Sequence, residues 1–395
     1  MKILHTSDWH LGQNFMGKSR EGEHKAFLDW LFKTIEGEGI DVLIVAGDIF
    51  DTGTPPNYAL ELYYNFLTKL SLSSCKNIII TAGNHDSIAT LKAPKELLKA
   101  LNIHVIVSGD ENENEIIEIY NDNELEGVIC AVPFLRDYVV RKSIDAQTMD
   151  EKEKSLTNGI KEHYKSVFKE ALAIVDGREI PIIATGHLTT LGSKTSESER
   201  EIYIGSTLDI DSRFLSEYFD FVALGHLHKN QKVGCDNIRY SGSPIPLSFS
   251  ESLSQKKVNI IEFNKKDISI KELDIPTFRP LLSIRGDVDF IVAKLETIKD
   301  KRTWIEVHLY DENPFFANEL IRSKAKELEL ILLAVKIDKI QKALNSEDLN
   351  VISLDELNPI DLFQQRMKKD ELEDENFANE LMKNFKEILM QVQNR

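Results

Sequence analysis

Five short apolar runs punctuate the chain, and each leads into a group of polar residues. The runs are four to six residues long, rich in β-branched and aliphatic side chains, and occupy residues 2–6, 41–46, 77–81, 182–185 and 221–224. Uninterrupted apolar runs of this length predict strands that are buried on both faces, with helices covering the sheet. Amphipathic stretches predict helices, for example over residues 23–35, 58–70 and 150–175. The alternation of strands and helices predicts an α/β fold.

The polar groups that follow the five runs share a small set of residue types. They read Asp8-Trp9-His10, Gly47-Asp48, Gly83-Asn84-His85-Asp86, Gly186-His187 and Gly225-His226-Leu227-His228. Since ligands gather beyond the carboxyl ends of the strands in such sheets, we expect these residues to converge on one edge. One such group alone is a weak signal, because an isolated Gly-His pair usually belongs to an ordinary loop. Five in succession, each after a predicted strand, indicate a single shared site.

These groups contain the side chains that bind divalent metal ions. Seven are candidate ligands: Asp8, His10, Asp48, Asn84, His187, His226 and His228. If the Asp48 carboxylate bridges two ions, the set supplies four contacts to each ion and leaves positions open for water and a phosphate oxygen. Neutral imidazole, carboxylate and amide oxygen suit manganese, iron or zinc better than calcium. Two ions roughly 3.5–4 Å apart clamp the attacking and leaving oxygens of an in-line displacement, so we expect hydrolysis of phosphoesters.

The stretches around these residues resemble the calcineurin-like metallophosphoesterases, and within them the bacterial nuclease subunits that work with an ATPase. The resemblance is carried by residues 3–12 (ILHTSDWHLG), 46–51 (AGDIFD), 185–189 (TGHLT) and 240–249 (YSGSPIPLSF), and extends over essentially the whole chain. It implies a metallophosphoesterase β-sandwich flanked by helices, with a small α/β capping domain and C-terminal helices. It also implies a metal-dependent exonuclease and endonuclease that acts on DNA ends and hairpins.

The resemblance further implies a role for each site residue. One ion, expected to be Mn²⁺, is assigned to Asp8, His10, Asp48 and His228, and a second Mn²⁺ to Asp48, Asn84, His187 and His226. His85 is not a ligand in this scheme: it faces the scissile phosphate and protonates or stabilises the leaving oxygen. Asp86 is expected to orient His85. Archaeal and eukaryotic relatives carry a second histidine that faces the substrate where this chain has Asp51, for which a loop role is at least as good an explanation as catalysis.

Length and composition agree with a chain of several globular domains. A length of 395 residues predicts two or three domains, and a hydrophobic fraction of 42% provides for a large core. The three cysteines are scattered, without disulfide or metal-binding spacing. No apolar run has the length of a signal peptide core or of a membrane helix, so we expect a cytoplasmic protein that makes no use of a membrane.

The net charge of −17 argues against simple DNA binding, because proteins that bind nucleic acids usually carry a basic surface. Two divalent ions would place positive charge at the site itself, which answers part of this objection. A partner that makes most of the contacts to the DNA backbone would answer the rest, and the family resemblance implies such a partner in the form of an SMC-like ATPase. We expect two nuclease subunits, as a homodimer, within a heterotetramer.

Changes of pattern predict three domains. Residues 1–275 contain all five polar groups and form the predicted nuclease domain. Residues 276–345 alternate strand and helix over residues 281–284, 289–298, 304–310, 314–327 and 330–337, which resembles the family's capping domain. Residues 346–395 form a polar tail with two helical pieces, in which apolar residues fall on one face. The tail residues expected to contact the partner are Ile360, Phe363, Met367, Phe377, Leu381, Phe385 and Ile388.

Three alternatives remain open at this point. The tail helices either dock on the coiled coil of the ATPase, as the resemblance implies, or fold back onto their own chain. The metal site alone also fits a phosphoesterase that acts on a small molecule or a phosphoprotein. A scaffold without catalytic activity is disfavoured, because a scaffold does not need a complete set of ligands together with His85.

Overall fold

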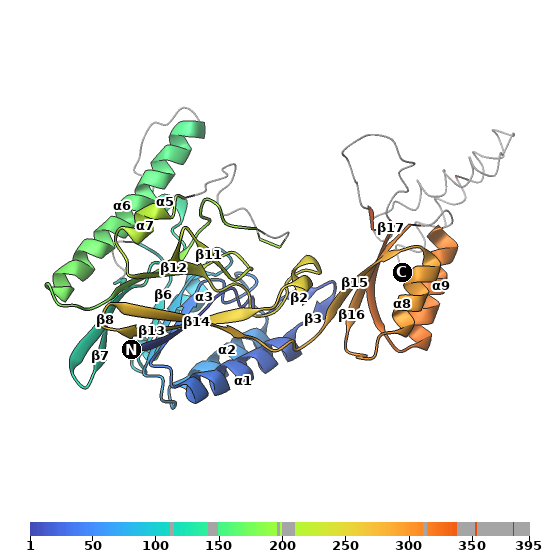
Figure 1. The fold of residues 1–395 in the computed structure, drawn as a ribbon, viewed down its shortest axis with the longest axis horizontal. Coiled ribbons are helices and arrows are strands. Elements are labelled where there is room, and N and C mark those ends of the chain that lie inside the picture. Colours follow the sequence, from blue (N-terminus) through green and yellow to red (C-terminus); the bar gives the residue numbers. More distant parts are fainter. Residues whose placement is uncertain are drawn as a thin grey trace. The chain divides into compact units, whose positions relative to one another are not determined.

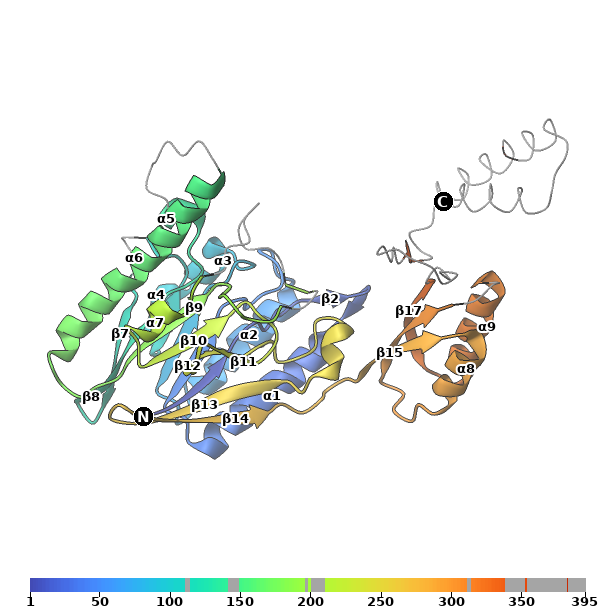
Figure 2. The ribbon, with the colours of Figure 1, turned by 45° about the horizontal axis from the view of Figure 1, so that its top comes forward.

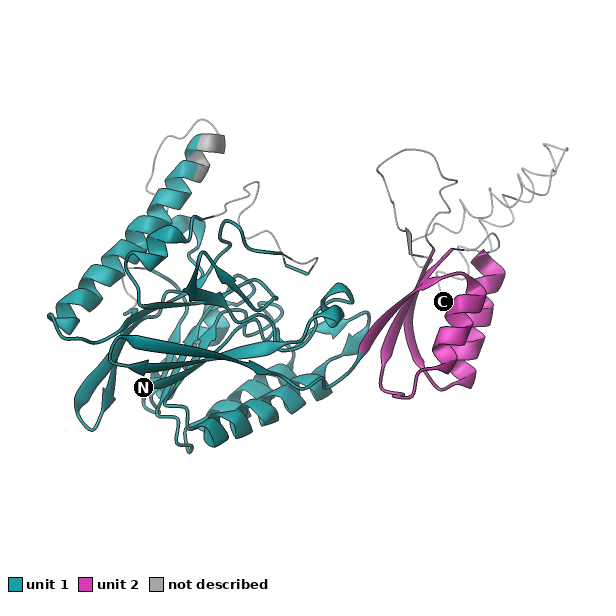
Figure 3. Ribbon diagram, in the orientation of Figure 1, with its two compact units in different colours: residues 1–280 teal, residues 281–395 magenta. Residues whose placement is uncertain are grey.

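The computed structural model describes residues 1–110, 114–140, 149–195, 198–199, 210–310 and 314–337, together with residues 352–353 and 382. The chain divides into two units, Met1–Pro280 and Leu281–Arg395 (Figure 3). The side chains predicted to contact a partner lie outside the described residues: Ile360, Phe363, Met367, Phe377, Leu381, Phe385 and Ile388. The functional division at residues 275 and 345 stays a prediction. No helix in the described part of the chain is long and apolar enough to span a membrane.

The first unit is built on two six-stranded sheets. The first has the order β14 (Asp267–Asp274), β13 (Lys257–Asn264), β1 (Lys2–Thr6), β4 (Val42–Ala46), β5 (Asn77–Thr81) and β6 (Ile103–Ile106). The second has the order β11 (Gln231–Val233), β12 (Cys235–Tyr240), β10 (Phe221–Gly225), β9 (Ile182–His187), β8 (Glu124–Cys130) and β7 (Ile116–Asn121). Strands β1, β4, β5 and β6 are parallel, and so are β8, β9, β10 and β12.

The two sheets face each other across an apolar core to which both contribute. Ile3 and Ile44 enter this core from the first sheet, and Ile183 and Phe221 enter it from the second. All residues of β4 and β10 are buried, as expected for strands covered on both faces. The structure therefore confirms the predicted α/β fold with a sandwich of two sheets.

Helices cover the outer faces of the two sheets. Helices α1 (Glu21–Glu38) and α2 (Asn57–Leu70) pack on the first sheet, and α6 (Met149–Val175) packs on the second. Figures 1 and 2 show α1 and α6 on opposite sides of the sandwich. The shorter elements of this unit are β2 (Asn14–Phe15), β3 (Lys18–Ser19), α3 (Ile88–Lys92), α4 (Lys95–Lys99), α5 (Asp137–Val140), α7 (Arg213–Ser216) and a 3₁₀ turn, η1 (Ser250–Leu253).

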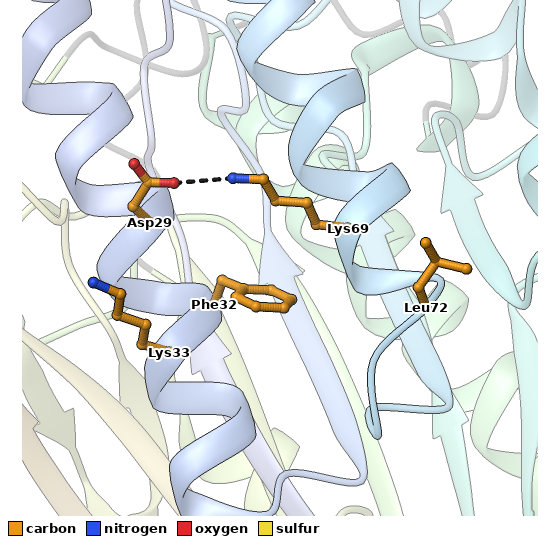
Figure 4. Close-up of a pocket in the computed structure, with 5 residues that line it drawn as sticks. All are labelled: Asp29, Phe32, Lys33, Lys69 and Leu72. Carbon is orange, nitrogen blue, oxygen red and sulfur yellow. Dashed lines mark hydrogen bonds and ion pairs between the residues drawn. The ribbon is translucent and has the colours of Figure 1, made fainter.

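Helices α1 and α2 flank a surface pocket of about 620 Å³ (Figure 4). An exposed ion pair joins the helices there, with 3.1 Å between Lys69 Nζ and Asp29 Oδ1. Such exposed pairs contribute at most about 1 kcal/mol, so apolar packing holds the helices in place. Trp9 is central to that packing, since its ring meets Phe27 of α1 and Phe66 of α2 edge to face at 5.8 and 5.5 Å. The loop after β1 is thereby anchored in the core.

The second unit follows the strand and helix pattern expected for residues 281–337. Its sheet has the order β15 (Leu281–Gly286), β16 (Trp304–Leu309), β17 (Ile331–Ile337) and β18 (Ile352–Ser353), the first three of them parallel. Helices α8 (Val288–Glu296) and α9 (Pro314–Glu327) bury Ile291 and Ile321 against the sheet. Asp287 caps α8 by accepting a hydrogen bond from the Phe290 amide at 2.8 Å.

The two sheets of the first unit lie close together at Gly225, the last residue of β10. A Cβ atom at this position would lie 1.8 Å from the carbonyl oxygen of Ala46, the last residue of β4. We therefore expect Gly225→Ala to destabilise the fold by about 1–3 kcal/mol, the usual cost of overpacking. Thermal unfolding followed by circular dichroism should show a lower Tm.

Gly37→Ala is the matched control. Gly37 lies in α1, and a Cβ atom there would meet nothing within 4 Å. Replacing glycine by alanine inside a helix usually stabilises by roughly 0.5–1 kcal/mol, so the control should unfold at or above the wild-type temperature. An unchanged Tm for Gly225→Ala would show that the sheets separate without cost.

Candidate metal centre

The predicted metal ligands lie at the carboxyl ends of strands from both sheets. Asp8 and His10 follow β1, Asp48 follows β4, Asn84 follows β5, His187 ends β9, and His226 and His228 follow β10. Each ligand thus comes from a point where a buried strand ends. The predicted ligands therefore meet at one end of the strands, as expected, but these strands belong to two sheets rather than one.

The side chains gather in two buried groups. Asp8, His10 and His228 form one group, in which one potential ligand atom of each residue lies within 4.8 Å of the others. Asp48, His187 and His226 form the second group by the same measure. Asn84 joins the second group, because its Oδ1 lies 2.9 Å from His187 Nε2. All seven predicted residues are therefore brought together.

The Asp48 carboxylate belongs to the second group and also faces the first. Its Oδ2 is 3.2 Å from His187 Nε2 in one group and 3.7 Å from His10 Nε2 in the other. Its Oδ1 accepts a hydrogen bond from the His85 amide at 2.9 Å. Gly83 leaves room for this arrangement, since a Cβ atom there would lie 2.1 Å from Asp48 Oδ1.

Four of the seven side chains project from left-handed backbone. The φ angles are +52° at Asp8, +47° at His10, +50° at Asp48 and +95° at His226. This region is uncommon for residues other than glycine and clusters at functional sites. Hydrogen bonds between these residues stabilise the strained backbone, for example the one that the His226 amide donates to Asp8 Oδ1 at 2.8 Å.

The chemistry of the cluster fits divalent cations. Both ring nitrogens of His10 are buried and face carboxylates, Nε2 that of Asp48 at 3.7 Å and Nδ1 that of Asp51 at 3.2 Å. His187 Nε2 faces two acceptor oxygens, one from Asp48 and one from Asn84. Buried polar groups normally have hydrogen-bond or metal partners. A divalent cation bound by these nitrogens and oxygens would provide such a partner.

The charges in the cluster depend strongly on one another. Burial lowers the pKa of His187, but the Asp48 and Asp8 carboxylates outweigh this effect and raise the pKa to about 9. Burial likewise opposes the ionisation of Asp48, yet the His187 ring holds the Asp48 pKa well below its usual range. A proton on His187 therefore supplies positive charge when no ion is bound.

Asp51 belongs to the site more closely than its sequence position suggested. Its Oδ1 lies 3.2 Å from His10 Nδ1, and its backbone carbonyl accepts a hydrogen bond from His85 Nδ1 at 2.7 Å. The rings of His10 and His85 meet edge to face at 4.8 Å. Asp51 therefore contacts both a predicted ligand and the predicted acid. In the sequence, Asp51 is marked by the Gly-Asp group that it follows and by the histidine that relatives carry at this position.

The Asp86 carboxylate is bound by backbone amides, which does not support its expected role beside His85. Its carboxylate accepts hydrogen bonds from the backbone amides of Ile49, Phe50 and Gly83 at 3.1, 3.0 and 2.8 Å. Burial and the nearby Asp48 charge raise the pKa of Asp86 to about 6. Asp86 thus connects the loops after β4 and β5. The His85 ring has a hydrogen-bond partner in the Asp51 carbonyl, where we expected the Asp86 carboxylate.

The raised pKa of His187 makes metal binding dependent on pH. His187 keeps its proton below about pH 9, and a cation at the same oxygens must displace that proton. We expect Mn²⁺ binding at pH 7 to release about one proton and the affinity to rise between pH 6 and 9. Calorimetric titration in two buffers with different ionisation enthalpies measures the release. Equal heats in both buffers would contradict a protonated His187.

Comparisons with known proteins agree with this geometry. The family model described as calcineurin-like phosphoesterase matches residues 1–230, and the type 5 capsule protein repressor C-terminal domain matches residues 277–371. The SbcD subunit of the nuclease SbcCD from Escherichia coli is 38% identical over 384 residues, which cover 95% of this chain and 94% of that protein. The protein of the same name from Bacillus subtilis is 31% identical over 317 residues, covering 78% of this chain and 79% of the relative.

The family shown by these matches is the one that the sequence resembles. The phosphoesterase model covers β1, β4, β5, β9 and β10, the strands whose ends carry the buried groups, and it implies divalent metals. The relatives extend the match over almost the full length of the chain. The chain therefore belongs to the calcineurin-like phosphoesterases, and within them to the family of SbcD nuclease subunits.

Proposed function

We propose that this chain is the catalytic subunit of an ATPase–nuclease complex and hydrolyses DNA phosphodiesters with two Mn²⁺ ions. The expected activities are those of a double-strand exonuclease and of an endonuclease on single strands and hairpins, used in end processing, repair and recombination. The observation that carries the proposal is the position of Asp48. Its carboxylate belongs to one buried group of ligands and also faces the other, as a bridge between two ions requires.

The two groups support a division of the ligands between two ions. In this proposal one ion is held by Asp8, His10, Asp48 and His228, and the other by Asp48, Asn84, His187 and His226. Each ion then has four protein ligands of nitrogen and oxygen type, a set that suits Mn²⁺. When bound, the ions polarise a phosphoryl oxygen and lower the pKa of a water molecule to make it a nucleophile.

His85 is the proposed proton donor to the leaving oxygen. The Asp51 carbonyl can only accept a hydrogen bond, so it holds the hydrogen on His85 Nδ1 and leaves Nε2 as the nitrogen whose protonation changes. The His85 amide donates to Asp48 Oδ1, which keeps this residue beside the carboxylate proposed to bridge the two ions. This arrangement suits general acid catalysis at one side of the metal pair.

DNA and an ATPase subunit are the proposed partners. The relatives are named as the SbcD component of the SbcCD nuclease, and this chain matches them over almost its full length. The net charge of −17 favours a division of labour, in which the partner binds most of the DNA backbone and this chain supplies the metal centre. We propose two copies of the chain in a heterotetramer with two SMC-like ATPase subunits, with the second unit acting as the capping domain.

Two variants test the catalytic proposal on hairpin DNA and on a small chromogenic phosphodiester. Asp48→Ala removes the bridge, so it should lose both ions and all cleavage. His85→Gln should keep both ions and lose cleavage by about 10²–10⁴-fold, the usual worth of general acid catalysis. Metal content is measured by calorimetry and mass spectrometry, and cleavage by gel electrophoresis.

His104→Gln is the matched control, because His104 lies within β6 rather than at the carboxyl end of a strand. It should cleave DNA at the wild-type rate. If His85→Gln lost an ion, His85 would be a ligand and the division of ligands would have to change. If the wild type hydrolysed the small diester but left DNA intact in the presence of its partner, the nuclease proposal would fail.

The tail offers a separate test of the partner. Phe385 lies in the middle of the predicted apolar stripe, and a charge there would be buried without a counter-charge on docking. We expect Phe385→Asp to abolish co-elution with the ATPase on gel filtration, while the free nuclease chain keeps its metal-dependent cleavage. Asn384→Asp adds the same charge beside the stripe and should co-elute normally. Co-elution of Phe385→Asp would favour a tail that folds back onto its own chain.

A further inference from the structure

The ring of His228 is held on its far side by a buried carboxylate. Its Nδ1 lies 3.2 Å from Glu251 Oε1 and 2.6 Å from Ser198 Oγ. The backbone amide of His228 also donates to Glu199 Oε1 at 2.8 Å. His228 is therefore held through its ring by Glu251 and through its main chain by Glu199, two acidic residues outside the predicted set of ligands.

Lys256 holds the Glu251 carboxylate in turn. Its Nζ donates to Glu251 Oε2 at 2.6 Å, to Ser243 Oγ at 2.8 Å and to the His228 carbonyl oxygen at 3.0 Å. These three acceptors use all three ammonium hydrogens. Glu251 and Lys256 are only 6% and 7% exposed, so the pair is a buried and fully hydrogen-bonded support.

A carboxylate in this position determines what the imidazole can do. The carboxylate only accepts, and Ser198 Oγ donates its own hydrogen to the carboxylate, so the hydrogen of the ring stays on His228 Nδ1 and the lone pair stays on Nε2. Histidines that bind metals commonly donate their other ring hydrogen to a carboxylate or carbonyl, which fixes the ring and increases its basicity. His187 has the same arrangement with a neutral acceptor, because its Nδ1 lies 3.1 Å from the Ala46 carbonyl oxygen.

We infer that Glu251 is a positioning residue for the first metal site, where it fixes the tautomer and orientation of His228, and that Lys256 holds Glu251 in place. This inference rests on the proposed function, since it takes His228 as a ligand of one of the two ions. It gives the two sites different supports: a charged carboxylate behind His228 and a backbone carbonyl behind His187. A charged acceptor makes the stronger hydrogen bond, so we expect the site that contains His228 to lose affinity when the Glu251 charge is removed.

A pocket beside these residues shows that the support is close to the surface. The pocket has a volume of about 630 Å³, and its lining includes His228, Glu251 and Lys229. The carboxylate is nevertheless buried, and its Oε2 also accepts a hydrogen bond at 3.1 Å from the amide of Leu247, which precedes the 3₁₀ turn η1. Glu251 therefore has both a local structural contact and a contact with the predicted ligand, and the test must separate the two.

Calorimetric titration of the full chain with Mn²⁺ provides the test. The wild type should show two binding steps. In Glu251→Gln, one step should weaken by about 10–100-fold, the usual effect of removing a support behind a metal ligand, and the other should not change. Glu251→Asp keeps the charge opposite Lys256 but withdraws it from His228, so it should weaken the same step and serves if the Gln variant does not fold.

The second unit offers a matched control. Glu306 is a buried carboxylate that also joins a histidine and a lysine, with 3.2 Å to His308 Nε2 and 2.9 Å to Lys336 Nζ. Glu306→Gln should leave both Mn²⁺ steps unchanged. As a readout without metal, nitrogen-15 spectra of histidine side chains should show His228 with its hydrogen on Nδ1 in the wild type and a mixture of tautomers in Glu251→Gln.

The outcomes separate this inference from the proposed function. Two unchanged steps in the Glu251 variants, with an unchanged His228 tautomer, would overturn the inference while the two-metal proposal stands. Equal weakening of both steps would also overturn it, because Glu251 would then support the whole centre rather than one ligand. A wild type that binds one ion or none would instead refute the two-metal proposal itself.

Discussion

The close contact of β4 with β9 and β10 is the constraint on which the site depends. The Ala46 carbonyl oxygen at the end of β4 lies against Gly225 in the other sheet, and the same oxygen lies 3.1 Å from His187 Nδ1. Because a carbonyl only accepts, it holds the hydrogen on Nδ1 and leaves Nε2 facing Asp48. One backbone oxygen of the first sheet thus sets the orientation of a side chain of the second, and the two halves of the centre cannot move independently.

The parts of the fold that follow from local sequence were predictable. Buried strands reveal themselves as continuous apolar runs, and β1 and β5 begin and end at the predicted residues. The sequence placed the polar groups at strand ends for the same reason, and the structure brings them together. The division of these strands between two sheets was open, since an apolar run does not identify its neighbour.

Contacts between side chains that lie far apart in the sequence could not be predicted. Asp86 was expected beside His85, the residue before it, but its carboxylate turns to the backbone amides of the loop after β4. Glu251 lies 23 positions beyond His228, and no spacing rule links them. Such contacts depend on how loops fold over the sheet edge, where the chain has no regular period. Residues that bind metals share a recognisable chemistry, whereas residues that hold those ligands can be of any polar type.

The left-handed backbone at Asp8, His10, Asp48 and His226 has a consequence for the evolution of the chain. Glycine would relieve the conformational strain at each of these positions, so a search for stability alone would replace the very side chains that form the centre. Activity and stability therefore select in opposite directions at the same four residues. In a gene copy that is no longer selected for activity, mutations should replace the residues of the metal centre before they destabilise the two packed sheets.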